Sequence, residues 1–314
     1  MENNEIRFDI LQIDSKIKKD QVFQQDDNKF QFCKEYIPDQ QEQDEKIDFP
    51  KYIAKITSKS FKYLGILSKN LKKESYGYNR YENEDEYFGQ WNKDKKEGYG
   101  IYYFKEPSGD SIQQIYVGEF KNNSKSGEGI YFHISKFDHE GEILVPVDFS
   151  LAIGNFLEDN FVKGLILTMK DGKRKIYKGK IDNEGKKNDD NAELYEDNDK
   201  AFHGIFRNNS MVEGRIVIVK NGEKENGYYF HKKEDEDVDF DYEKEGNDDE
   251  RLVNQLNQFN DAFQYEKIKD LFLNIMSLKF KATAVDDFEY MKNLNYDLDI
   301  KQNLKDQYGK YLYF

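Results

Sequence analysis

The chain has 314 residues, enough for one or two domains, and 15% of them are aromatic while 35% are charged. No apolar run reaches the roughly 18 residues that a membrane-spanning helix needs, and the acidic N-terminus resembles neither a signal peptide nor a transit peptide. A single cysteine, Cys33, excludes an intrachain disulfide. We therefore expect a soluble protein of the cytoplasm.

The formal net charge of -14 is distributed unevenly. It amounts to -6 in residues 1–50, +2 in residues 51–233, -10 in residues 234–250 and 0 in residues 251–314. The middle segment lacks the basic excess that nucleic-acid binding requires. The charge therefore predicts no nucleic-acid partner. We expect the four segments to be separate parts of the chain, with domain boundaries between them.

Residues 1–50 mix polar runs with two alternating stretches, IRFDILQI at 6–13 and FQFCKEYI at 30–37. Alternation of apolar and polar residues is typical of β-strands. We predict an acidic N-terminal arm with one or two short strands that docks partly on the residues that follow. The alternative is a disordered acidic tail.

Residues 51–233 contain six related units, each opening on an apolar or aromatic residue, one variable residue and a glycine. The units begin YLGIL at 63, YFGQW at 87, YVGEF at 116, AIGNF at 152, YKGKI at 177 and FHGIF at 202. Their first glycines are Gly65, Gly89, Gly118, Gly154, Gly179 and Gly204. After a polar link, two units continue into a second arm with a pair of glycines, namely Gly98 and Gly100, and Gly127 and Gly129.

The clearest unit, residues 87–104, reads YFGQWNKDKKEGYGIYYF. Tyr87, Gly89 and Trp91 share one face of a strand, and GYGIYYF again places glycines and a tyrosine together. The polar link NKDKKE is longer than a two-residue hairpin loop. Each unit is therefore predicted to be a β-hairpin in which an aromatic ring of a neighbouring strand covers bare glycine backbone.

Six such hairpins can pair edge to edge, because a single hairpin is marginal in water. The prediction is a mainly β fold, an elongated single-layer antiparallel sheet of twelve strands spanning roughly 58 Å. Each hairpin contacts only its neighbours.

The pattern Y-x-G-x-[WF], a polar link and G-x-G-x-x-x-[YF] resembles the MORN repeat, most closely at residues 87–104 and 116–132. Four units depart from the pattern at the second-arm glycines, where they carry Ser75, Ile166, Ile216, and the pair Asn188 and Asp190. The resemblance covers residues 63–218 and implies a binding platform for other proteins.

A one-layer sheet leaves one face without a second sheet, and an exposed aromatic surface usually marks an interaction site. We expect a partner groove that holds extended or helical segments of other proteins. Its candidate residues are Tyr87, Trp91, Tyr102, Tyr116, Phe120 and Tyr131. The alternative is that these rings only pack the sheet.

Residues 234–250 form an acidic block of the kind that serves as a solvated linker. Asp237, Asp239 and Asp241 imitate the first ligands of an EF-hand loop, but Tyr242 stands where its turn needs glycine. We predict no calcium site here.

Residues 251–314 change to helical spacing, with apolar residues that recur over 252–263 and 268–276, and again over 288–294 and 298–308. We expect a small α-helical C-terminal domain. It would either cover the open edge of the last hairpin or dock on another protein.

No group of residues predicts catalysis. The four histidines form no zinc-binding pair, and the glycines do not match a phosphate-binding loop. We therefore expect no enzyme activity, no catalytic residue, no metal and no cofactor.

Three functions remain open. The first is a structural scaffold of a cytoskeletal assembly, because similar MORN repeats occur in radial-spoke-head and other axonemal proteins. Abundant tyrosine and rare proline, 23 and 4 residues, suit the AT-rich genomes of many ciliated protists and favour a ciliary axoneme. The second is a cytosolic peptide-binding adaptor. The third is a phospholipid-binding module at a membrane surface, which the charge disfavours because only residues 170–180 form a basic cluster.

Overall fold

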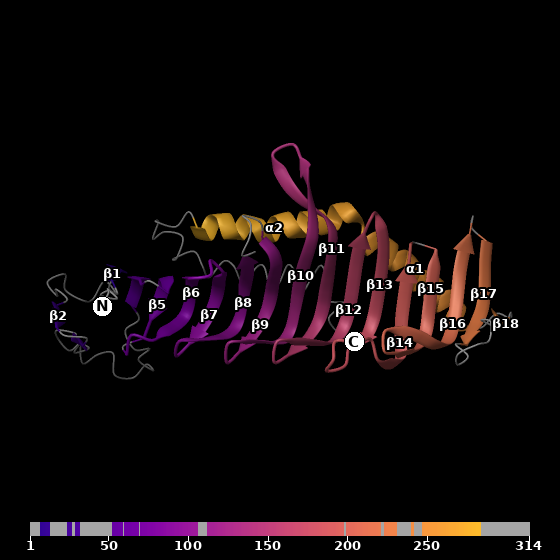
Figure 1. Cartoon of the computed structure of the whole chain (residues 1–314), viewed down its shortest axis with the longest axis horizontal. Coiled ribbons are helices and arrows are strands. Elements are labelled where there is room, and N and C mark those ends of the chain that lie inside the picture. Colours follow the sequence, from indigo (N-terminus) through magenta and orange to yellow (C-terminus); the bar gives the residue numbers. More distant parts are fainter. Residues whose placement is uncertain are drawn as a thin grey trace, which may run out of the picture.

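The computed structural model describes the backbone of residues 7–12, 24–26, 29–31, 52–58, 60–68, 70–105, 112–197, 199–220, 223–230, 240–241 and 247–283. Sixteen strands form one antiparallel sheet whose strand order follows the chain order. The result is an elongated open ribbon with two helices along it (Figure 1). The predicted sheet of hairpins with a helical C-terminal part is confirmed.

Twelve of these strands are the arms of the six predicted hairpins. They are β5 (Phe61–Leu67), β6 (Lys73–Tyr81), β7 (Glu86–Asn92), β8 (Lys95–Lys105), β9 (Ile112–Lys121), β10 (Ser124–Glu140), β11 (Ile143–Leu157), β12 (Asn160–Lys170), β13 (Lys173–Lys180), β14 (Asp189–Glu196), β15 (Lys200–Arg207) and β16 (Ser210–Lys220). The sheet is extended at one end by β1 (Arg7–Gln12) and β4 (Tyr52–Thr57), and at the other by β17 (Glu223–Phe230) and β18 (Phe240–Asp241).

The N-terminal arm supplies β1, as the first alternating stretch predicts, and this strand pairs with β4 at the edge of the sheet. β2 (Gln24–Asp26) and β3 (Lys29–Gln31) form a separate two-stranded sheet. The rest of the second stretch, including Cys33, lies outside the described residues, as do the EF-hand-like aspartates before Phe240 and the two helices expected after residue 283.

One row of small residues crosses the sheet in register. It runs through Gly65, Gly77, Gly89, Gly100, Gly118, Gly129, Gly154, Gly164 and Gly179, then Ala192, Gly204 and Gly214. Gly164 and Gly214 therefore stand at the second glycine of their arms, and Ala192 takes this place in β14. The sequence alignment placed the second glycine two residues too late in the arms of Gly164 and Gly214, whose bulges are shorter, and two residues too early in the arm of Ala192.

The size of the bulges explains the shift at Gly164 and Gly214. Between Gly89 and Trp91, one residue of β7 faces three residues of β8, and the same count recurs in the first and third hairpins. In the fourth and sixth hairpins the bulge contains a single extra residue. The predicted glycines Gly98 and Gly127 lie in the larger bulges at φ 79° and 62°, a left-handed region that favours glycine. Ser75 adopts the same conformation, with φ 58°.

The hairpins turn more tightly than the polar links suggested. Asn92 pairs directly with Lys95, so Lys93 and Asp94 alone form the turn. Both have positive φ, as do the central residues of three other hairpin turns, which defines type I′ turns. These are Asn122 and Asn123, Glu158 and Asp159, and Asn208 and Asn209. The prediction of a longer link was wrong, because the charged residues after the turn belong to the second arm.

Two helices, α1 (Asn247–Ala262) and α2 (Tyr265–Thr283), lie across one face of the sheet (Figure 1). We call this the helix face. Their apolar residues join a single core with alternate residues of the strands, such as Ile115, Phe132 and Leu151. The helices therefore cover a face of the sheet, whereas the sequence suggested its last edge. α1 also begins within the predicted acidic linker, where Glu250 of its first turn suits the positive end of a helix dipole.

Candidate functional site: the aromatic face

The opposite face, which we call the aromatic face, carries the glycine row and the tyrosines that open the hairpins. Tyr63, Tyr87, Tyr116 and Tyr177 each donate their hydroxyl to the backbone carbonyl three residues further on, over 2.8–2.9 Å. A Cβ at Gly118 would lie 2.6 Å from both Gly129 Cα and the Tyr116 hydroxyl. Tyr63, Tyr87 and Tyr116 each cover a glycine of their own strand and, as predicted, a glycine of the neighbouring strand in the same hairpin.

A second aromatic residue joins the second, third, fourth and sixth hairpins to the one before them. Phe120 packs edge to face against Tyr87 of the preceding hairpin and Tyr116 of its own, with ring centroids 5.1 Å apart in both cases. Trp91 lies in the same way between Tyr63 and Tyr87, and its indole N–H donates to Gly77 O over 3.1 Å. Such pairs contribute roughly 0.5–1.5 kcal/mol each beyond area burial. The row of rings therefore connects successive hairpins.

The predicted groove residues fall into two groups. Tyr87, Trp91, Tyr116 and Phe120 are at most 5% exposed, so they pack the sheet and offer no free surface. This burial corrects the predicted lining of the partner groove. For these four residues the alternative holds, namely that the rings only pack the sheet. Tyr102 and Tyr131 are half-buried and lie on the outer side of the same cluster.

Tyr102 and Tyr131 belong to a row of half-buried rings that we call the aromatic strip, made of Tyr81, Tyr102, Phe104 and Tyr131. Tyr81 stacks on Tyr102 at 5.9 Å, Phe104 lies 4.4 Å from Tyr102, and Tyr131 lies 6.5 Å from Phe104. The Tyr102 hydroxyl donates to Asp85 Oδ2 over 3.0 Å, and Tyr131 is linked to Gln114 over 2.5 Å. The hydrogen bonds hold the outer rings in place.

Four lysines, which we call the lysine row, project their ammonium groups over rings of the aromatic face. They are Lys73, Lys96, Lys125 and Lys187. The Lys96 Nζ lies 4.2 Å from the Tyr102 ring centre and within 6 Å of Tyr81, Tyr87 and Phe120. The Lys125 Nζ lies 4.7 Å from the Tyr131 ring centre. The cations are thus held by the negative faces of aromatic rings.

Burial lowers the pKa of Lys73 and of Lys96 to about 8, since rings replace water around the ammonium groups. Burial also lowers the pKa of Lys125 and of Lys187. Conversely, burial raises the pKa of the tyrosines beneath them, including Tyr63 and Tyr87. Replacing an ammonium group by an apolar side chain would avoid this desolvation, so the repeated use of lysine here requires an explanation.

The turns position the lysine row. Asp94, in the second hairpin turn, donates its N–H to Lys73 O over 3.1 Å and accepts from Lys73 N over 2.8 Å. Asn123 makes the same two bonds with Lys96, and Asp159 makes them with Lys125. Each turn therefore fixes the lysine of the preceding hairpin. The row was not predicted from the sequence, although three of the lysines stand four residues before a second-arm glycine.

The aromatic face is not covered by the helices. Within the described part of the chain, its two buried clusters contain strand and turn residues alone. All the apolar helix residues that join a buried cluster belong to the core of the helix face. Among the described residues, the aromatic strip and the lysine row therefore lie on the face of the sheet that neither helix covers.

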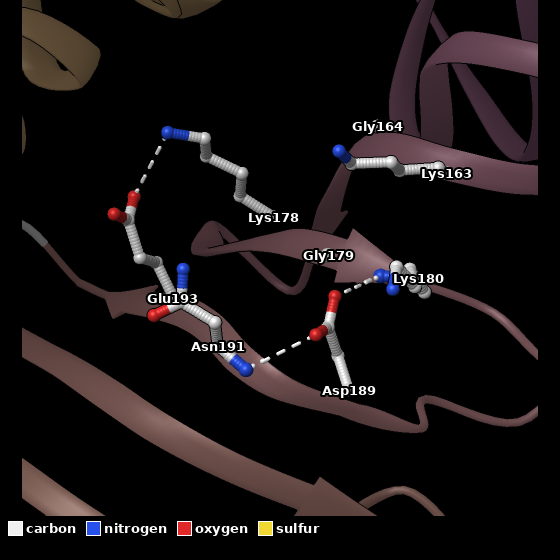
Figure 2. A pocket seen from close by; sticks show the side chains of 8 residues that line it. All are labelled: Lys163, Gly164, Lys178, Gly179, Lys180, Asp189, Asn191 and Glu193. Atoms are coloured by element: carbon white, nitrogen blue, oxygen red, sulfur yellow. Dashed lines mark hydrogen bonds and ion pairs between the residues drawn. The ribbon is translucent and has the colours of Figure 1, made fainter. Parts of the chain in front are cut away.

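The helix face has a polar cavity of about 330 Å³ between β12, β13 and β14 (Figure 2). Asp189, on its wall, accepts hydrogen bonds from the backbone N–H groups of Lys180 and Asn191, over 2.8 and 3.0 Å. Glu193 pairs with Lys178 at 3.3 Å and with Arg251 of α1 at 2.7 Å. Burial opposes ionisation of Glu193, but these cations hold its pKa below the usual range. The carboxylates of the cavity thus bind its own walls and anchor α1.

In the part of the chain that the structure describes, no three metal-binding side chains gather at one place. Neither described helix is long and apolar enough to cross a membrane. The chain matches no protein-family model and no curated protein.

Proposed function

We propose that the chain is a non-enzymatic MORN-type scaffold that holds partner proteins on its aromatic face. The observation that carries this proposal is the open aromatic strip, with half-buried rings that stand on a buried row of tyrosine, tryptophan and phenylalanine. Exposed aromatic surface on a rigid sheet is costly in a free protein and favourable when a partner covers it.

The assembly that we propose is cytoskeletal, and specifically a ciliary axoneme. The support is the resemblance of residues 63–218 to repeats of radial-spoke-head proteins, together with the glycine row, which places Gly164 and Gly214 in register with Gly100 and Gly129. An elongated ribbon suits this role, because it presents the same surface to several partner chains along its length.

Localisation of the tagged full-length chain tests the assembly. We expect it in the axoneme and resistant to detergent extraction, with cross-links to other axonemal chains. A diffuse cytosolic distribution with one dominant partner would favour the adaptor function. Recovery with membranes, lost at high salt, would favour the membrane-surface function.

A further inference from the structure

We propose that the lysine row binds acidic residues of the partner. The preferred ligand of the row is an extended acidic segment with a carboxylate at every third residue. The proposal rests on the proposed scaffold function and names the chemistry of its partner. It concerns the first three members of the row, Lys73, Lys96 and Lys125, which lie at equivalent positions of β6, β8 and β10.

The ammonium groups have unused donor capacity. An ammonium group can donate three hydrogen bonds, and aromatic rings accept none of the ordinary kind. Lys73 donates to Asn79 Oδ1 over 2.5 Å. In the described part of the chain, Lys96 and Lys125 Nζ have ring contacts but neither a hydrogen bond nor an ion pair. A carboxylate that approaches from the open side would supply the missing acceptor and a charge-assisted bond.

The carboxylates that the structure describes near the row are already engaged. Asp94 accepts from Lys73 N and pairs with Lys72 at 2.6 Å. Asp159 accepts from Lys125 N, and Asp85 accepts from Lys105 N and the Tyr102 hydroxyl. These groups orient the strands and turns around the row, and none forms an ion pair with a row lysine. The row is therefore left for an external anion.

The spacing of the row defines the occupant. The three lysines stand on alternate strands, so they repeat about every 9.6 Å along the ribbon. A polyproline II segment advances about 3.1 Å per residue and returns to the same side every third residue, which gives a repeat of about 9.3 Å. Such a segment would place one carboxylate at each lysine while its other residues pack on the aromatic strip, as proline-rich peptides pack in aromatic grooves.

A membrane surface fits these features less well. Phosphate headgroups favour clustered cations that project from the protein. Here single ammonium groups are recessed among half-buried rings, and each has an aspartate of the chain nearby. An inserted peptide side chain suits this arrangement better than a flat anionic surface.

The test is the affinity of the full-length chain for a blocked, fluorescently labelled peptide Glu-Pro-Pro-Glu-Pro-Pro-Glu at low salt. We expect saturable binding, and binding about tenfold weaker to the Lys96→Met/Lys125→Met variant, which keeps the apolar stems but loses two charge-assisted bonds. Lys121→Met is the matched control, because Lys121 is exposed beside the same turn and lies outside the row. It should bind like the wild type. A thermal melt of each variant verifies folding.

Two further probes make the proposal falsifiable. The peptide Glu-Glu-Glu-Pro-Pro-Pro-Pro has the same charge but the wrong spacing, and equal affinity for it would overturn the register argument. Lysine-dependent binding to vesicles of phosphatidylcholine with phosphatidylinositol bisphosphate, without peptide binding, would replace the acidic segment by a membrane. If the spaced peptide binds but the chain is absent from the axoneme, the proposed assembly fails and the lysine row stands. If the chain is axonemal but the peptide does not bind, the proposed occupant of the lysine row fails and the proposed assembly stands.

Discussion

The two faces of the sheet are built from alternate residues of the same strands, yet they are stabilised by contacts of different range. On the aromatic face, Phe120 touches the tyrosines of its own and the preceding hairpin. On the helix face, the Tyr103 hydroxyl donates to Ile275 O, a partner 172 residues away in the chain. One face is therefore a series of local joints, whereas the other forms only when the C-terminal helices return. In the described part of the chain, the helices therefore cover one face of the sheet and not the aromatic face.

Phe120→Ala should have the largest effect on stability. It removes a buried ring from a joint between two hairpins and leaves a cavity, at a cost of about 3–5 kcal/mol in the free energy of unfolding. Chemical denaturation measures the change. Lys121→Ala, an exposed neighbour on the opposite face, should stay within about 0.5 kcal/mol. A loss at Phe120 as small as that of the control would mean that the hairpins do not depend on this joint.

Phe259→Ala should cost about 3 kcal/mol but act locally, because its ring packs on Tyr195 at 4.7 Å and belongs to the helix face. Hydrogen exchange should show faster exchange in α1 and α2, while the amides of β7 to β10 retain their protection. Gln258→Ala, exposed on the same helix, is the control. Equal loss of protection in both regions would contradict the separation of the two faces.

Gly118→Ala should cost about 2 kcal/mol, because the added methyl group meets Gly129 Cα and the Tyr116 hydroxyl. The matched control is Gly172→Asn, in a turn where no atom lies within 4 Å and where asparagine tolerates the positive φ. The difference between the two melting temperatures measures the close approach of strands on the aromatic face. Tolerance of alanine at Gly118 would show that the ring can move away.

The lysine row should give the smallest effect, a rise in stability with pH. Folding lowers the pKa of Lys73 and of Lys96 to about 8, from an unfolded value near 10.5. Between these values the unfolded chain binds more protons, so the free energy of unfolding increases with pH. We expect an increase of about 1 kcal/mol, because both groups keep part of their solvation. The charged groups that act on these lysines are Asp94 for Lys73, and Asp85, Asp159 and Lys125 for Lys96.

Above about pH 10 the tyrosines of the unfolded chain ionise, whereas burial raises their pKa in the folded chain, so stability should then decrease. Unfolding titrations from pH 7 to pH 11 measure both limbs. The Lys73→Met/Lys96→Met variant should lose the rising limb and keep the falling one. A rising limb that persists in this variant would assign the effect to other groups.

The sequence predicted the aromatic face better than the helix face, for a physical reason. The hairpins recur within the chain, so Tyr87, Gly89 and Trp91 could be compared with five related units. The helix face is filled by ordinary alternating apolar residues, and its partner helices stand far away in the sequence. Periodicity predicted helices at Leu252 and Ile268, but it carried no information about the surface on which they dock.

The candidate site was predicted in part. The repeat pattern predicted that Trp91 and Phe120 line one groove, but not that neighbouring rings bury them, because burial depends on the bulges and on the distance between hairpins. From the sequence, the lysines in the polar links were expected to be solvated turn residues. Only the two-residue turns, which move Lys96 into the second arm, place its ammonium group over the rings.

The most direct test of the central claim places a photo-cross-linking phenylalanine derivative at Tyr102 or Tyr131 in the living cell. Gln258, exposed on the helix face, is the matched control position. If the aromatic face holds partner chains, the two aromatic-strip positions should give the same axonemal polypeptide in covalent adducts, and Gln258 should not capture it. Adducts with that polypeptide at Gln258, and none at Tyr102 or Tyr131, would contradict the account.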